Sequence, residues 1–406
     1  MENNEKNKVK LSSEKKIFFK GIILGAIILI WTYTVVNGGM IFYRRNNANR
    51  EIPIEEKIEI ITNLLDINFV GEIEEANLRD GIFRGLVEGA GDRYTTYLTT
   101  AEFTRFIDAQ RGTFVGIGAG VAEADGGGVL ILSPFEGGPA YNAGILPGDI
   151  IRAVDGTSIL TYSLEVAISM ITGDEGTVVN LTVYREFENR TFDIDITRAV
   201  IQVPTVNFEI LEEGIGYIRL SEFGAFSRVQ FAEAVEALKE EGMEALIVDV
   251  RNNPGGRLDV VVGITETLVP EGLILFMNDA SGQRTDFTSR GAYLGIPMVV
   301  LINGNSASAS EVLAGAVQDH GVGTIIGEQS FGKASVQDFF PLPDGSAVRI
   351  TIATYYTPNG QAINNHGLTP DIVVEMDPFL SARISSIERY EDVQLIKAIE
   401  YLQNNN

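Results

Sequence analysis

Ser308 has the sequence surroundings that a nucleophilic serine needs. It lies in the run N-G-N-S-A-S-A-S-E at residues 303–311, between an apolar run typical of a buried strand and a run with helical periodicity. A serine at a strand-to-helix turn is exposed at the sheet edge, where free N–H groups and the helix dipole favour an oxyanion. Ser308 and Glu311 also match a capping box, and this segment alone favours the capping role.

Lys333 follows Gly332 in a turn after the apolar run T-I-I-G-E. Desolvation beside apolar strands lowers the pKa of a lysine from its ordinary value of about 10.4, so that a neutral amine can act as a base. A Gly-Lys turn is more commonly a solvated surface lysine. The lysine therefore becomes a candidate base only together with other evidence.

Two glycine-containing segments could present backbone N–H groups. Gly255 and Gly256 end the turn R-N-N-P-G-G after a strand, where their N–H groups could point into a site, although an ordinary turn explains them equally. The other segment consists of Phe114, Val115, Gly116, Ile117 and Gly118. No helix follows it, which argues against a dinucleotide loop. Such N–H groups can hold a peptide carboxylate beside a strand edge, and a glycine-rich hairpin is the competing interpretation.

The remaining composition excludes several kinds of catalysis. The chain has no cysteine, which excludes a Cys nucleophile, and no cluster of metal ligands, so that neither a metal nor a cofactor is expected. Of the two histidines, His320 lies 12 residues beyond Ser308 along the same predicted helix, about 18 Å away at helical rise. His366 lies in a polar loop and stays open as an alternative base.

Hydrophobic periodicity predicts the elements that position these residues. Residues 51–110 carry the three- and four-residue spacing of helices, and residues 112–200 form short β-type runs with one helical interruption. From about residue 213 strands and helices alternate, which predicts an α/β core with a mixed sheet and flanking helices. Residues 379–406 are helical and charged.

Residues 21–43 form an uncharged run that predicts a membrane anchor. At helical rise the run spans about 34 Å, and a bilayer core is about 30 Å thick. Six lysines precede it and three arginines follow, which predicts a single-pass protein with residues 1–20 in the cytoplasm and the body outside the cell membrane. A cleaved signal peptide competes, but no clean Ala-x-Ala site follows. The net charge of −24 argues against nucleic acid as a partner.

Five segments in order resemble the carboxyl-terminal processing peptidases, also called tail-specific proteases. These segments are F-V-G-I-G-A-G-V, G-G-P-A-Y-N-A-G-I-L-P-G-D-I-I-R-A-V-D-G, A-L-I-V-D-V-R-N-N-P-G-G, N-S-A-S-A-S-E-V-L-A-G-A-V-Q-D-H-G and G-E-Q-S-F-G-K-A-S-V-Q. The resemblance implies a PDZ domain at 112–200 inserted before a Ser–Lys protease core at 201–378. It also implies protein substrates with free C-termini, and a homodimer built from the terminal helical segments 51–110 and 379–406. Packing of these segments on their own chain would explain their pattern equally well.

The resemblance also assigns roles to individual residues. It makes Ser308 the nucleophile and Lys333 the general base, and it gives Gln337 a role in supporting the lysine. Because residues 333 and 337 would lie about 13 Å apart on an ideal strand, the last role needs a bulge or a turn. The implied oxyanion hole comprises the N–H of Ala309 and that of Gly255 or Gly256, and the segment 114–118 is the implied peptide-binding loop.

Two competing functions remain open at this point, and one departure from the family is visible. A PDZ-bearing membrane scaffold with an inactive protease core would need no catalytic pair, and a Ser–His hydrolase would use His366. The departure is Arg93, where the family commonly has proline. It affects the local turn and none of the catalytic motifs.

Overall fold

The computed structural model describes residues 29, 31, 33 and 52–405 of the chain. The chain divides into two compact units, Met1–Arg79 and Asp80–Asn406. Within the described residues, no helix combines the length and the apolar character that a bilayer crossing requires. The predicted anchor at 21–43 lies outside the described residues apart from positions 29, 31 and 33, and the predicted tail at 1–20 lies wholly outside them.

Three helices occupy the segment 51–110, as its periodicity predicts. They are α2 (Ile54–Asn68), α3 (Glu75–Glu88) and α4 (Thr100–Gln110). The short strand β1 (Thr96–Leu98), which lies between α3 and α4, is not predicted by the sequence periodicity. A three-residue strand is too short to show a period of its own, and it forms because it pairs with the distant strand β18 (Ala347–Tyr356).

The region that resembles a PDZ domain contains a sheet with the strand order β3-β4-β5-β7-β8. The sheet strands are β3 (Ala119–Glu123), β4 (Val129–Pro134), β5 (Ile150–Val154), β7 (Val178–Arg185) and β8 (Arg190–Thr197). The predicted helical interruption is α6 (Leu164–Ile171), and its buried side chains join the apolar core of this sheet. A separate pair, β2 (Thr113–Gly116) and β9 (Ala199–Gln202), carries the chain into and out of the region. Strand β3 ends the strand order, so one of its edges is unpaired.

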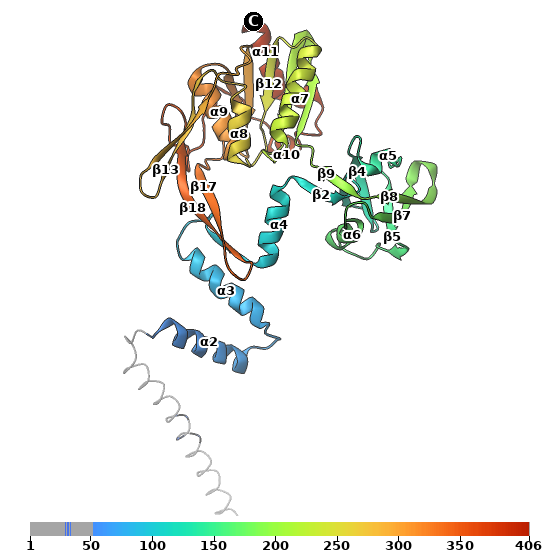
Figure 1. The fold of residues 1–406 in the computed structure, drawn as a ribbon, viewed down its shortest axis with the longest axis vertical. Helices are drawn as coiled ribbons and strands as arrows, with labels where there is room; N and C mark the ends of the chain where they lie inside the picture. Colours follow the sequence, from blue (N-terminus) through green and yellow to red (C-terminus); the bar gives the residue numbers. More distant parts are fainter. Residues whose placement is uncertain (1–28, 30, 32, 34–51, 406) are drawn as a thin grey trace, which may run out of the picture. The chain divides into compact units, whose positions relative to one another are not determined.

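The C-terminal core has the predicted α/β architecture. Its six-stranded sheet has the order β10-β11-β12-β15-β16-β19, parallel except for the antiparallel pair β10–β11. The strands are β10 (Val206–Ile210), β11 (Ile215–Leu220), β12 (Ala245–Asp249), β15 (Met298–Ile302), β16 (Thr324–Gly327) and β19 (Ile372–Val373). Three helices pack on one face and one on the other (Figure 1); they are α7 (Ser227–Glu240), α8 (Leu258–Thr265), α9 (Ala309–His320) and α11 (Val393–Asn405).

Strand β12 shows why the core strands are apolar throughout. Leu246 and Val248 pack into the cluster with α7, α8 and α9, whereas Ala245 and Ile247 pack into the cluster with α11. Successive side chains of a strand point to opposite faces, and here both faces are covered. Strand β12 also pairs in parallel with β15, so the carboxyl ends of the two strands lie side by side. This pairing brings the turn after β12 to the start of α9.

A second, antiparallel sheet completes the protease core. It contains β18, β13 (Gly272–Asp279), β14 (Arg284–Ser289) and β17 (Ser335–Pro341). Helix α4 packs against β17, where the rings of Phe106 and Phe339 stack with centroids 4.2 Å apart. This contact brings a helix from the N-terminal half of the sequence to the strand that follows Lys333.

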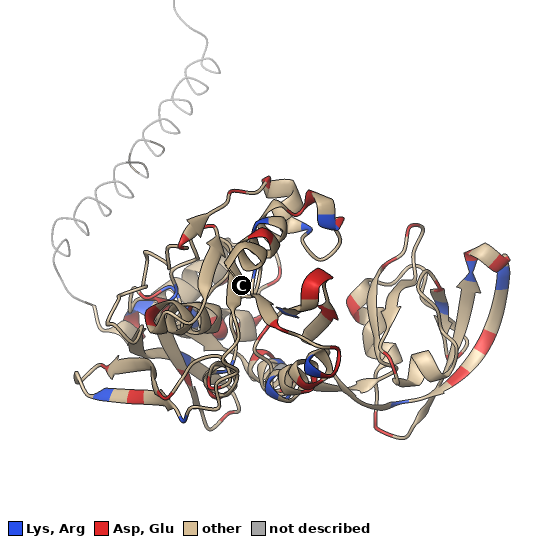
Figure 2. Cartoon of the chain, turned by 90° about the horizontal axis from the view of Figure 1, so that it is seen from above, with Lys and Arg blue, Asp and Glu red and all other residues tan. Residues whose placement is uncertain are grey.

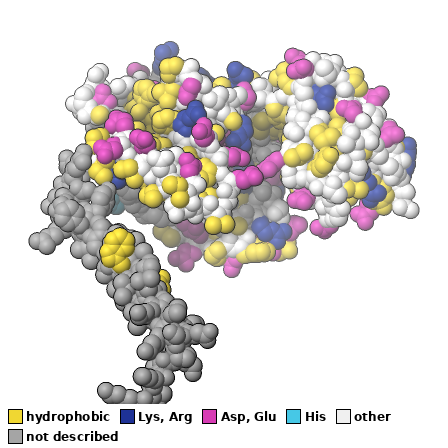
Figure 3. Space-filling view, turned by 90° about the horizontal axis from the view of Figure 1, so that it is seen from below, with side chains coloured by type: hydrophobic (Ala, Val, Ile, Leu, Met, Phe, Trp, Pro, Cys, Tyr) yellow, Lys and Arg dark blue, Asp and Glu magenta, His cyan; other side chains and the backbone are white. Residues whose placement is uncertain are grey.

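Acidic side chains are spread over the described surface. Figure 2 shows Asp and Glu on many separate elements, and on the face drawn in Figure 3 they alternate with apolar and neutral side chains. Such a distribution supports solubility as the explanation of the net charge of −24, because one acidic patch would be expected for a basic partner.

Candidate active site

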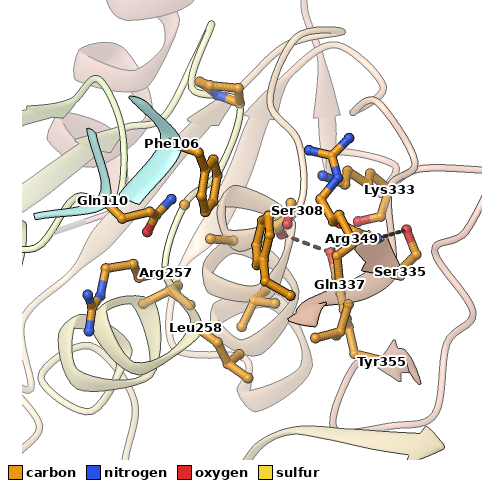
Figure 4. A pocket seen from close by; sticks show the side chains of 17 residues that line it. Phe106, Gln110, Arg257, Leu258, Ser308, Lys333, Ser335, Gln337, Arg349 and Tyr355 are labelled. Atoms are coloured by element: carbon orange, nitrogen blue, oxygen red, sulfur yellow. Dashed lines mark hydrogen bonds between the residues drawn. The ribbon is translucent and has the colours of Figure 1, made fainter. Parts of the chain in front are cut away.

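A pocket of about 440 Å³ contains both predicted catalytic residues. Ser308 and Lys333 line it, and Figure 4 shows them close together with Gln337 and Arg349. Phe106 of α4, Leu258 of α8 and Phe339 of β17 supply apolar wall. The pocket is therefore a concave site with a few polar groups on an apolar lining, which suits a peptide side chain next to a reactive hydroxyl.

Ser308 immediately precedes α9 and has strained backbone geometry. Its φ is 57° and its ψ is −113°, an uncommon conformation for a non-glycine residue that persists only when the surroundings fix it. The two neighbouring serines supply part of that fixation. The hydroxyl of Ser306 donates to the Val250 carbonyl at 2.8 Å, and that of Ser310 donates to the Asn253 carbonyl at 2.9 Å. Both are fully buried, so Ser308 is the serine of the triplet that lines the pocket.

Glu311 connects the segment of Ser308 to that of Lys333. Its buried carboxylate accepts hydrogen bonds from four donors: the N–H of Ser308 at 2.8 Å, the N–H of Gly332 at 2.8 Å, the N–H of Lys333 at 2.9 Å, and the hydroxyl of Ser330 at 2.5 Å. Burial raises the pKa of Glu311, and these donors oppose the shift. The capping box that the sequence predicts is present, but it describes only one of these contacts.

The amine of Lys333 has no hydrogen bond and no ion pair with any residue that the structure describes. It lies 4.8 Å from the centroid of the Tyr94 ring. Burial lowers the pKa of Lys333, Arg349 and Arg93 lower it further by repulsion, and Glu311 opposes them. The neutral amine required of a base is therefore favoured by this environment.

The backbone of the turn after β12 lies against Ser308. A Cβ atom on Gly255 would lie 2.8 Å from the Ser308 Cβ and 3.0 Å from the Ala309 nitrogen, and a Cβ atom on Gly256 would lie 2.4 Å from the Phe223 carbonyl oxygen. Both glycines have positive φ, at 106° and 147°. Only glycine allows so close an approach with this backbone geometry.

The two glycines differ in what their N–H groups do. That of Gly255 donates to the Asn253 side-chain oxygen at 2.9 Å. Those of Gly256 and Ala309 donate to no residue in the described part of the chain, and both residues line the pocket. The sequence left the choice between Gly255 and Gly256 open, and the geometry favours Gly256 together with Ala309 as the pair of free donors.

Gln337 meets the geometric condition that its predicted role requires. A register shift between Val336 and Gln337 marks a bulge in β17, and Lys333 and Gln337 line the same pocket. The Gln337 amide nitrogen donates to the hydroxyls of Ser335 at 2.8 Å and Thr351 at 3.3 Å. Within the part of the chain that the structure describes, no hydrogen bond joins it to the amine of Lys333, so its support of the lysine stays a prediction.

The two histidines lie elsewhere. His320 Nε2 is 2.8 Å from the Leu273 carbonyl oxygen, and His366 Nδ1 is 2.8 Å from the Asn364 carbonyl oxygen. Neither lines the pocket that contains Ser308. The described residues also contain no group of three or more side chains that could hold a metal ion. This arrangement weighs against the Ser–His alternative.

A buried ionic network that the sequence patterns do not predict lies beside the turn after β12. The fully buried guanidinium of Arg251 donates to both carboxylate oxygens of Asp249, at 2.9 and 2.6 Å, and to both of Asp392, at 2.8 Å each. It thereby ties the end of β12, where the turn begins, to the segment before α11. Local sequence signals could not reveal this pair, because its members are 141 residues apart.

The predicted peptide-binding segment is divided between a strand and a loop. Phe114, Val115 and Gly116 belong to β2 and pair with β9. The N–H groups of Ile117 and Gly118 make no hydrogen bond within the described residues, and Gly118 has a φ of 73°. These two residues directly precede the edge strand β3.

Comparisons with known proteins find relatives over most of the chain. The model of peptidase family S41 matches residues 214–374, and a PDZ-domain model matches residues 131–185. The carboxy-terminal-processing protease of Bartonella bacilliformis is 34% identical over 371 residues, covering 89% of this chain and 82% of that protein. The carboxy-terminal processing protease CtpB of Bacillus subtilis is 32% identical over 335 residues, covering 80% of this chain and 69% of that protein.

A crystal structure assigned to an S41 protease of Bacteroides fragilis shares the fold. It covers 88% of this chain and 99% of its own, with a TM-score of 0.51 at 17% identity. The sequence relationships carry more weight, because they extend over most of both chains at more than 30% identity. The chain therefore belongs to peptidase family S41 and is a PDZ-containing, serine-type carboxyl-terminal processing peptidase that acts on proteins.

Proposed function

We propose that this peptidase cleaves by a Ser–Lys dyad, with Ser308 as nucleophile and Lys333 as general base. One observation carries the proposal: both residues line one pocket, and a single buried carboxylate, that of Glu311, accepts hydrogen bonds from both backbone N–H groups. The alternative of an inactive PDZ scaffold does not require Ser308 and Lys333 to line the same pocket. Turnover assays on Ser308→Ala and Lys333→Ala test the proposal.

The mechanism follows from the protonation states. The neutral Lys333 amine accepts the Ser308 hydroxyl proton while the oxygen attacks the scissile carbonyl carbon, and the resulting oxyanion faces the free N–H groups of Ala309 and Gly256. The lysine then passes the proton to the leaving amine as the C–N bond breaks. Lys333 next takes a proton from water as the water oxygen attacks the ester carbonyl carbon. It returns that proton to the Ser308 oxygen as the C–O bond of the ester breaks, which frees the new carboxyl terminus and restores the neutral amine. Gln337 is proposed to support the lysine from the bulged strand β17.

We further propose that the loop before β3 holds the substrate's terminal carboxylate. Two free N–H groups at Ile117 and Gly118 precede a strand with an unpaired edge, the combination by which an extended peptide is added to a sheet. Phe114, Val115 and Gly116 then support this loop through β2.

Amidation of a substrate's C-terminus is expected to weaken binding. It removes a charge-assisted set of hydrogen bonds worth about 1.5–3 kcal/mol, which corresponds to an increase in Kd of about 10- to 100-fold. The measurement is Kd for matched free-acid and amidated peptides on the Ser308→Ala variant. Equal affinities would contradict tail recognition and would leave the protease assignment intact.

Two glycine substitutions, one in the proposed carboxylate-binding loop and one outside it, test the same proposal. Gly118→Val should raise the Kd of the free-acid peptide to that of the amidated peptide. Gly118 has a φ of 73°, and a Cβ atom at this position would lie 3.0 Å from Ile201 Cδ1, so the substitution should displace the loop that presents the N–H groups. Gly126→Val introduces a comparable backbone strain at a φ of 87° with open space around it. Binding should survive the second change.

The membrane anchor at residues 21–43 is proposed on the hydropathy of the sequence. The full chain is expected to sediment with membranes and to resist extraction by high salt, since an apolar helix is held by the bilayer and not by charge. Protease added outside spheroplasts should degrade the body. A protected body, or a mature N-terminus beyond residue 43, would contradict this topology. The mass of the detergent-solubilised chain in analytical ultracentrifugation distinguishes the homodimer that the resemblance implies from packing of the terminal helical segments on their own chain.

A further inference from the structure

Three basic side chains from distant parts of the sequence surround Tyr94 beside the active-site pocket. The Lys333 Nζ lies 4.8 Å from the centroid of the Tyr94 ring, and the Arg93 Cζ lies 4.9 Å from it. Arg349 of β18 donates from Nε to the Tyr94 carbonyl oxygen at 3.0 Å. Arg349 and Lys333 both line the pocket, and Figure 4 shows their side chains next to each other.

No carboxylate in the described part of the chain forms an ion pair with any of these three cations, although the chain has 55 acidic and 31 basic residues. The acidic group that faces Lys333 is Glu311, and its oxygens bond backbone N–H groups and a hydroxyl instead of the amine. Like charges placed together without a counter-ion disfavour the protonated form of whichever group can titrate.

We propose that Arg349 and Arg93 are positioning residues of an electrostatic kind, whose fixed charges around Tyr94 keep the Lys333 amine neutral and so able to act as the base. The inference rests on the proposed role of Lys333. An arginine stays charged throughout the pH range of an enzyme assay, so the lysine is the member of the cluster that loses its proton.

The groups around Lys333 support this assignment. The titratable or charged groups that face it are Arg349 and Tyr355 of β18, Arg93 and Tyr94 before β1, and Glu311 of α9. Burial holds the pKa of Tyr355 well above its ordinary value, so that this phenol stays neutral while it donates to the Lys333 carbonyl at 2.6 Å. After burial, Arg349 and then Arg93 are the largest causes that lower the pKa of Lys333, and Glu311 opposes them.

The two arginines should contribute unequally. Arg349 is half-buried and anchored by its hydrogen bond, whereas Arg93 is exposed and contacts the rings of Tyr94 and Phe331. Solvent screens an exposed charge more strongly, so Arg349 should have the larger effect. The family that this sequence resembles commonly has proline at the position of Arg93. The effect of the Arg93 charge on Lys333 is therefore not expected in relatives that have proline there.

The test is the pH profile of kcat/KM, measured on the full chain in detergent with a peptide that has uncharged side chains and a free C-terminus. Removing a positive charge raises the pKa of Lys333, so less of the amine is neutral below that pKa and the acid limb moves to higher pH. We expect a shift of about 0.5–1 pH unit for Arg349→Gln and a smaller one for Arg93→Gln, with the alkaline plateau kept within about twofold. Arg349→Lys and Arg93→Lys should stay close to the unaltered chain.

The matched control is Arg284→Gln, which removes the same charge from an exposed ion pair with Asp286 on β14 and should leave the profile unchanged. An acid limb that stays in place in Arg349→Gln, or a profile lowered by one factor at every pH, would overturn the inference, since the second result indicates a purely structural role. Arg93 is exposed, and within the described residues its side chain contacts only the rings of Tyr94 and Phe331, so Arg93→Gln keeps the test decisive if Arg349→Gln does not fold.

The two possible failures are distinguishable. If Lys333→Ala retains activity, the proposed base is wrong and the inference falls with it. If Lys333→Ala is inactive and the acid limbs of the arginine variants coincide with that of the unaltered chain, only the electrostatic role of the arginines is overturned.

Discussion

Replacing Ser308 with alanine is expected to lower kcat/KM for a peptide substrate by about 10,000-fold or more, and replacing Lys333 with alanine by a similar factor. The first change removes the attacking oxygen, and the second removes the group that accepts its proton. Steady-state turnover of one peptide with a free C-terminus measures both effects. The free energy of unfolding of Lys333→Ala should change little, because the Lys333 amine bonds no described residue and the Glu311 contacts to both segments are made by backbone N–H groups.

The controls for these variants are surface residues of the same types. Lys239 on α7 pairs with Glu236 at the exposed surface, and Ser281 lies in the turn between β13 and β14. Lys239→Ala and Ser281→Ala should keep full activity. Ser306→Ala and Ser310→Ala should keep substantial activity but unfold more easily, by about 1–2 kcal/mol each, because their hydroxyls hold the loop beside Ser308. Full activity in Lys333→Ala would contradict the dyad.

Glu311→Gln is expected to lower kcat by about 100-fold or more and to destabilise the fold by about 2–4 kcal/mol. An amide has one acceptor oxygen where the carboxylate has two, and its NH2 group would face donors. At least one of the buried donors around Glu311, which include the N–H groups of Ser308 and Lys333, would lose its partner. Turnover and urea unfolding of the same preparation measure the two effects.

Two further variants serve as controls for Glu311→Gln. Glu236→Gln removes a carboxylate from the exposed face of α7 and should change neither quantity. Glu311→Asp keeps two acceptor oxygens but shortens the side chain, so it should recover part of the stability and less of the activity. If Glu311→Gln were destabilised yet fully active, Glu311 would serve the fold alone, and its proposed role in holding the two catalytic segments together would be wrong.

The sequence predicted the parts of this site that depend on local patterns. Ser308 at the start of α9 and the apolar strands of the core follow from short runs of sequence, and both are found where they were expected. The need for a bulge between Lys333 and Gln337 also followed from strand geometry, and the register shift in β17 meets it.

The sequence could not predict contacts between distant segments. Arg251 meets Asp392 across 141 residues, and Arg349 meets Tyr94 across 255 residues. No local period or motif encodes such pairs, because they form only when the sheets assemble. The sequence also could not predict the hydrogen-bond partner of a single N–H group. Gly255 and Gly256 are adjacent and of the same type, but only the N–H of Gly255 donates to Asn253.

The most direct test of the Ser–Lys dyad is the residual turnover of the double variant Ser308→Ala/Lys333→Ala beside the two single variants. The residues of one catalytic unit are strongly non-additive, and the remaining activity comes from binding and from the oxyanion donors. We predict that the double variant is slower than Ser308→Ala alone by no more than about threefold. A double variant that loses the product of the two single factors would show that Ser308 and Lys333 act independently, and it would contradict the dyad.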